Sequence, residues 1–124
     1  MKSYFLPLSF LLLTVNVLLA QAPAGKLISG PWAGNVELRT ATIWAEVSPR
    51  VKSVAVQFHP EGKPAAIRKV TYTGALGKEF NPVKIELGAL EMNTTYRYQL
   101  LIDGQPQKTT FATRLTTKEL WQWR

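Results

Sequence analysis

The sequence predicts an all-β protein, an antiparallel β-sandwich that follows a secretory signal peptide. Three observations support this prediction. Short segments of apolar and polar alternation recur along the chain between turns rich in Gly, Pro and Asn. No internal stretch repeats its apolar residues with the 3.6-residue period of a helix. The chain has 124 residues, and the part beyond the signal peptide has the size of a two-sheet sandwich, about 100 residues.

Residues 1–20, MKSYFLPLSFLLLTVNVLLA, are typical of a signal peptide, because one cation, Lys2, precedes an apolar run that ends on a small residue. We expect cleavage after Ala20. Cleavage after Ala22 fits the small-residue rule better but places Pro23 beside the cut. The alternative is an uncleaved membrane anchor, since a span needs about 20 apolar residues. We expect export, with no stable membrane insertion after cleavage.

The rest of the chain divides into a linker at residues 21–26, a sandwich at residues 27–114 and an exit segment at residues 115–124. In the stretch PVKIEL, Val83, Ile85 and Leu87 share one face, as expected of a strand with one side in a core. Strands are predicted at Leu27–Ser29, Asn35–Leu38, Thr40–Val47, Ser53–Phe58, Ala66–Tyr72, Val83–Leu87, Thr95–Ile102 and Thr109–Thr113.

The composition restricts the partners and the compartment. The net charge is +7, but the 15 Lys and Arg residues are scattered and form no run beyond the adjacent pair Arg68-Lys69. A solvated basic surface therefore explains the charge better than a polyanion site, and we expect no nucleic-acid partner. The chain has no Cys, so it has no disulfide and no lipid attached through cysteine. A bacterial periplasm, cell surface or extracellular location fits this composition.

The reactive side chains are few. His59 is the only His and Asp103 the only Asp, too few for the usual ligands of a catalytic zinc. We expect His59 at a strand edge on the surface, and Asp103-Gly104 as a hairpin turn. The chain lacks a nucleophile elbow and a phosphate-binding glycine loop. We expect no catalytic residue, no cofactor and no metal ligand in this chain.

The tryptophans lie outside the predicted core pattern. In TATIWAEV, the aliphatic residues alternate on one face, so Trp44 lies on the other. Trp32, Trp121 and Trp123 also fall outside the alternation. Several indoles off the core of a small domain indicate either docking against another surface or ordinary packing under long side chains. Both interpretations stay open at this point.

The stretch LEMNTTYRY places Leu90, Thr94 and Tyr96 at the spacing L-x-x-x-T-x-Y. This pattern resembles the tyrosine corner of fibronectin-type-III and other immunoglobulin-like sandwiches, in which a Tyr hydroxyl bonds to backbone upstream. The resemblance makes the expected fold an immunoglobulin/fibronectin-III-like β-sandwich. The glycosylation sequon Asn93-Thr94-Thr95 within it is interpreted as incidental.

A second resemblance covers most of the chain beyond the signal. The segments LISGPWAGNVELRTATIWAEV (27–47), LEMNTTYRYQLLIDG (90–104), FATR (111–114) and LWQWR (120–124) occur in this order. Together they resemble the N-terminal domain of PhoD-like alkaline phosphatases. The resemblance implies an exported parent protein in which metal ions and catalytic residues belong to a C-terminal phosphoesterase domain. None of that domain's motifs occurs here, so this chain is expected to be the accessory part, with the phosphoesterase domain as its partner.

Two alternatives remain. One is a freestanding secreted binding or adhesion module of the fibronectin-III kind. The other is the related N-terminal sandwich of purple acid phosphatases, which the LISGP start and the LWQWR end fit less well. On the leading interpretation, Trp121 and Trp123 pack against the phosphoesterase domain or its linker, and Trp32 contributes to the same contact.

Overall fold

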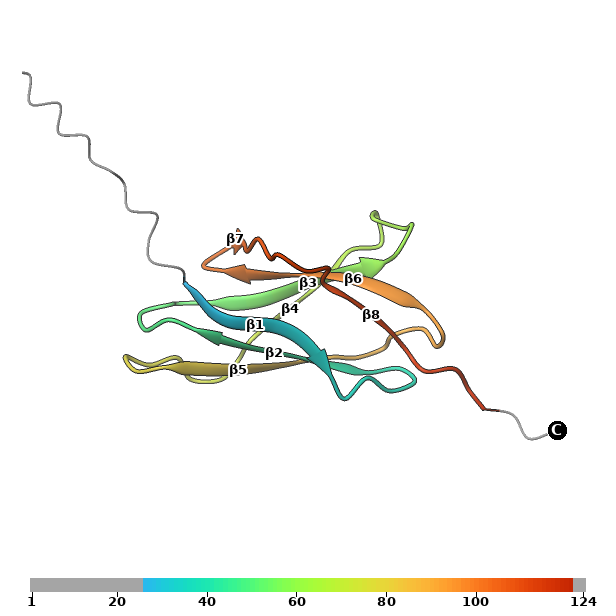
Figure 1. Cartoon of the computed structure of the whole chain (residues 1–124), viewed down its shortest axis with the longest axis horizontal. Helices are drawn as coiled ribbons and strands as arrows, with labels where there is room; N and C mark the ends of the chain where they lie inside the picture. Colours follow the sequence, from blue (N-terminus) through green and yellow to red (C-terminus); the bar gives the residue numbers. More distant parts are fainter. Residues whose placement is uncertain (1–25, 122–124) are drawn as a thin grey trace, which may run out of the picture.

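The computed structural model describes residues 26–121, which form two antiparallel sheets packed face to face (Figure 1). One sheet has the order β1-β2-β5, and the other has β4-β3-β6-β7, with β8 also paired to β6. No described residue is helical. The predicted immunoglobulin/fibronectin-III-like sandwich is therefore confirmed. The strands are β1 (Leu27–Gly34), β2 (Ala41–Val47), β3 (Val54–Pro60), β4 (Arg68–Thr71), β5 (Asn81–Leu87), β6 (Thr95–Ile102), β7 (Gln105–Pro106) and β8 (Arg114–Thr116).

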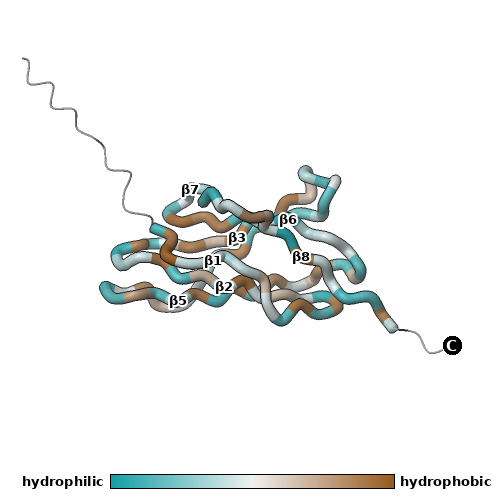
Figure 2. The backbone as a smooth tube through the Cα atoms, in the orientation of Figure 1, coloured by the Kyte–Doolittle hydropathy of each residue, from teal (hydrophilic) through white to brown (hydrophobic). Residues whose placement is uncertain are grey.

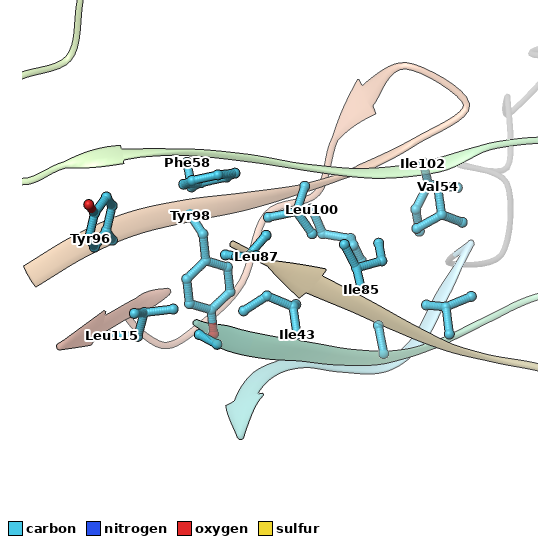
Figure 3. Packing of buried hydrophobic residues seen from close by; sticks show 14 of the residues in the cluster. Ile43, Val54, Phe58, Ile85, Leu87, Tyr96, Tyr98, Leu100, Ile102 and Leu115 are labelled. Atoms are coloured by element: carbon cyan, nitrogen blue, oxygen red, sulfur yellow. The ribbon is translucent and has the colours of Figure 1, made fainter. Parts of the chain in front are cut away.

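The core lies between the sheets, where the alternating residues of each strand point inward. Both hydrophobic and hydrophilic patches occur along the strands (Figure 2). Ile43 and Leu87 of the first sheet lie across from Phe58 and Leu100 of the second (Figure 3), and none of the four is more than 1% exposed. Burying one such side chain contributes about 1.5–3 kcal/mol. The inward faces predicted for β2 and β5 are both found in the core, together with those of β3 and β6.

The first correction to the predicted strands concerns residues 35–38. The sequence predicts a strand at Asn35–Leu38, but these residues form bends and irregular backbone between β1 and β2. Asn35 has a positive φ of 47°, which ends the extended conformation of β1. The amide of Glu37 then donates to the carbonyl of Thr40 at 2.8 Å. The pairing with β2 is made instead by Trp32–Gly34, beyond the predicted end of the first strand at Ser29.

The second correction concerns residues 109–113, predicted as a strand and observed as bends and irregular backbone. The Thr109 hydroxyl donates to the carbonyl of Phe111 at 2.7 Å, so a side chain competes with the sheet for a backbone group. The strand begins directly after the predicted range, at Arg114, as β8, which pairs with β6. The packed structure also continues past residue 114, since Leu115 and Thr117 are 5% and 3% exposed.

The Asp103-Gly104 turn joins β6 to β7, as predicted. Both residues have positive φ, 49° and 79°, which is the conformation that a two-residue hairpin turn needs. Asp103 has a further role that its position in the sequence did not indicate. Its Oδ1 accepts from the amides of Lys52 and Ser53 at 2.8 and 3.0 Å, and its Oδ2 accepts from Lys26 Nζ at 2.9 Å. The carboxylate therefore holds three segments together.

We expect this carboxylate to make stability depend on pH. The hydrogen bond from Lys26, and those from the amides of Lys52 and Ser53, lower the pKa of Asp103 against an opposing effect of desolvation. Because the pKa is lower in the folded state, the stabilisation is complete above about pH 4 and is lost as pH falls through the folded pKa. Asp103→Asn should lower the free energy of unfolding at pH 7 by about 1–2 kcal/mol and should flatten its decline in acid.

Thermal unfolding between pH 7 and pH 2 measures this effect. Glu119→Gln is the matched control, because Glu119 is exposed and forms no ion pair with any described residue. An acid profile of Asp103→Asn that parallels that of the unsubstituted protein would contradict the role of Asp103.

Candidate functional site

Two tryptophans lie side by side on the outer face of the β1-β2-β5 sheet. Trp32 of β1 pairs with Trp44 of β2, and Trp44 pairs with Lys84 of β5, so the three side chains share one face. Lys84 Nζ lies 5.3 Å from the centre of the Trp44 ring, within cation–π range. Trp44 is half-buried, while Trp32 remains 51% exposed. We call this row of three residues the indole face.

Two glycines provide the space that the indoles need. A Cβ built at Gly30 would lie 2.8 Å from the Trp44 carbonyl oxygen and 2.9 Å from Trp32 Cε3, and Gly30 also has a φ of +82°. A Cβ built at Gly34 would lie 3.1 Å from Trp44 Nε1. Side chains at these positions would displace the rings, so the GPWAG segment of β1 sets how the indoles rest on the sheet.

The C-terminal segment leaves the sandwich at the end where β1 finishes (Figure 1). Thr117 is buried there and donates from Oγ1 to the carbonyl of Glu91 at 2.6 Å. Lys118 is held by the loop after β1, with its amide donating to the Glu37 carbonyl and its Nζ 3.0 Å from Glu37 Oε2. Trp121, three residues further, is 71% exposed. Trp123 lies outside the described residues.

The three residues of the predicted tyrosine corner come together between β5 and β6. Tyr96 Oη accepts the amide hydrogen of Glu91 at 2.8 Å, and the Tyr96 ring packs 6.2 Å from Phe58. Leu90 is fully buried. Thr94 donates from Oγ1 to the Met92 carbonyl at 2.8 Å. These contacts fix the crossover from one sheet to the other and involve no reactive group.

The two reactive side chains singled out in the sequence, His59 and Asp103, lie far apart. Asp103 accepts from the amide of Ser53, just before β3, whereas His59 lies near the other end of that strand and donates from Nδ1 to the Pro60 carbonyl. Position 59 is six residues beyond position 53 along nearly fully extended backbone, a distance of about 20 Å. A Ser-His-Asp arrangement of these two residues is therefore ruled out.

The described residues also offer no site for a metal ion. Within 26–121, no group of three or more His, Cys, Asp or Glu side chains is placed to bind one. The same part of the chain contains no helix with the length and hydropathy to cross a membrane.

The sequence did not predict the polar hollow on the outer face of the second sheet. It has a volume of about 470 Å³. Arg97 of β6 lies opposite His59 of β3 on one side and Arg114 of β8 on the other. Sequence spacing could not bring out this cluster, because the β6–β8 pairing joins residues from separate segments. The side chains that line the hollow come mainly from Gln57, His59, Arg97, Gln99, Lys108 and Arg114.

Comparisons with solved structures show the same fold. The chain is similar to the sensor domain of the anti-sigma factor RsgI4 of Pseudobacteroides cellulosolvens, in its longer form, with a TM-score of 0.57 and 13% identity over 74% of this chain and 88% of that one. The shorter form gives a TM-score of 0.53 with 14% identity, over 78% and 99% of the two chains. A computationally redesigned β-sandwich protein gives 0.55 with 22% identity, over 75% and 95%.

No family model matches the chain. No curated protein matches it either. At these low identities the structural similarities concern the β-sandwich fold alone.

Proposed function

We propose that this chain is the non-catalytic N-terminal domain of an exported PhoD-like alkaline phosphatase, and that its indole face docks against the phosphoesterase domain. The four sequence segments that resemble this family support the proposal. On this proposal, the metal ions and the ester hydrolysis belong to the phosphoesterase domain. The sandwich would fix the orientation of that domain.

The observation that carries the proposal is the position of the indole face beside the chain's exit. Gly34 is the last residue of β1, and Trp32 lies two residues before it. Trp32 is therefore within about 7 Å of the end of the strand. The loop that follows β1 also binds Lys118. A domain that follows the exit segment would therefore begin close to Trp32. A large exposed aromatic beside such a junction is the kind of side chain that interfaces bury.

A double substitution in the full-length gene product tests the docking. Trp32→Ser with Trp121→Ser should weaken the coupling between the domains by about 1–2 kcal/mol, because two exposed indoles lose their contacts. We expect thermal unfolding to separate into two transitions and phosphatase activity to fall. The isolated chain carrying the same substitutions should unfold near its usual temperature, since both side chains are at least half exposed.

Phe80→Ser is the matched control. Phe80 is 68% exposed and precedes β5 at the other end of the sheet, so its loss should leave the coupling unchanged. Unchanged unfolding and activity of the double variant would overturn the docking. Metal-dependent hydrolysis of a chromogenic phosphate ester by this chain alone would overturn the non-catalytic assignment.

A further inference from the structure

The polar hollow is built on a regular part of the second sheet. Its floor consists of outward side chains of β3 and β6, in two cross-strand rows: Gln57 opposite Gln99, and His59 opposite Arg97. The segment between β7 and β8 forms one wall with Lys108 and Thr109. Because the rows belong to paired strands, their spacing is fixed by the sheet.

The charges of the hollow favour an anion. Arg97 and Arg114 are directly opposite each other in the β6–β8 pair, and like charges in that relation repel. Both approach the same atom, Glu61 Oε1, at 3.2 and 3.6 Å. One carboxylate thus faces two guanidinium groups, and Lys108, a third cation, forms no ion pair with any described residue. The site keeps a positive excess that an oxyanion would neutralise.

The remaining polar groups favour a ligand with hydroxyls beside its anionic group. The side-chain amides of Gln57 and Gln99 form no hydrogen bond with any described residue, so each can donate and accept. Tyr98 is the one aromatic residue in the lining, and it is only 5% exposed. Without an exposed ring, the described lining lacks the platform on which neutral sugars and bases stack.

We propose that the polar hollow binds a polyhydroxylated oxyanion the size of a sugar, either phosphorylated or carboxylated. The anionic group lies between Arg97 and Arg114, where guanidinium groups can bind it with two parallel hydrogen bonds. The hydroxyls bind the amides of Gln57 and Gln99. The hollow is on the opposite sheet from the indole face, so ligand binding is independent of the proposed docking.

An NMR titration of the purified protein tests the site with four probes: glucose 6-phosphate, glucuronate, glucose and inorganic phosphate. We expect one or both sugar anions to shift the side-chain amide signals of Gln57 and Gln99, and the tighter of the two identifies the anionic group. Glucose should give no shift, and inorganic phosphate should bind about tenfold more weakly because it lacks the hydroxyl contacts. No binding by either sugar anion would overturn the proposal, as would equal binding of glucose or of inorganic phosphate.

Substitutions that remove either a positive or a negative charge from the hollow distinguish a specific binding site from attraction by the net charge of the protein. Arg114→Gln should weaken binding about tenfold or more, whereas Lys78→Gln, the same charge change outside the hollow, should leave it unchanged. Glu61→Gln should tighten binding severalfold, because the internal carboxylate no longer competes for the two guanidinium groups. Its matched control is Glu79→Gln. Equal effects of the variants and their controls would show attraction by net charge and would contradict the site.

Discussion

Replacing Leu90 with Ala should lower the free energy of unfolding by about 2–5 kcal/mol. Leu90 is fully buried, and it lies where the chain crosses from β5 to β6. Its amide donates to the carbonyl of Arg39 at 3.0 Å, which anchors the crossover and limits how far the backbone could close the space left by the lost side chain. Denaturation in urea, followed by circular dichroism, measures the change.

Leu120→Ala provides the comparison for this experiment. It removes the same atoms from a side chain that is 52% exposed, and it should change stability by no more than about 0.5 kcal/mol. A loss below about 1 kcal/mol for Leu90→Ala would mean that the crossover can collapse around the cavity, against the fixed arrangement described above.

The second large effect should come from Tyr96. Tyr96→Ala should cost about 3–5 kcal/mol, because it removes a ring that is 3% exposed and packs against Phe58. Tyr96→Phe keeps the ring and removes only the acceptor of the Glu91 amide, so it should cost about 1–2 kcal/mol. The difference between the two variants separates packing from hydrogen bonding.

Tyr72→Phe is the control for the hydroxyl, since the Tyr72 side chain forms no hydrogen bond with a described residue. Urea denaturation of the three variants should rank them Tyr96→Ala, Tyr96→Phe, Tyr72→Phe in decreasing loss. Equal stability of Tyr96→Phe and the unsubstituted protein would show that the bond to Glu91 does not hold the corner.

The sandwich could be predicted because its signals are local. Alternation in β2 and β5 assigned their inward faces correctly, and Asp103-Gly104 marked a hairpin. The strand predicted at Thr109–Thr113 failed because the alternation there is overridden by a side-chain bond from Thr109, which sequence patterns do not report.

The indole face and the polar hollow differ in how much of each could be predicted from the sequence. Trp44 could be placed outside the core from its own strand, because alternation fixes the face of each residue. The meeting of Arg97 with Arg114 depends on the register between β6 and β8, and no local pattern specifies a pairing between separate segments. For the same reason, the triple contact of Asp103 with Lys26, Lys52 and Ser53 was not predicted.

Hydroxyl-radical footprinting of Trp32 tests the proposed docking most directly. The oxidation rate of Trp32, read by mass spectrometry, is compared between this chain alone and the full-length gene product. With the indole face buried against a phosphoesterase domain, the rate should fall severalfold in the full-length protein, while the rate of Phe80 stays the same. Equal rates for Trp32 in the two proteins, or a gene product without a phosphoesterase domain, would contradict the proposed function.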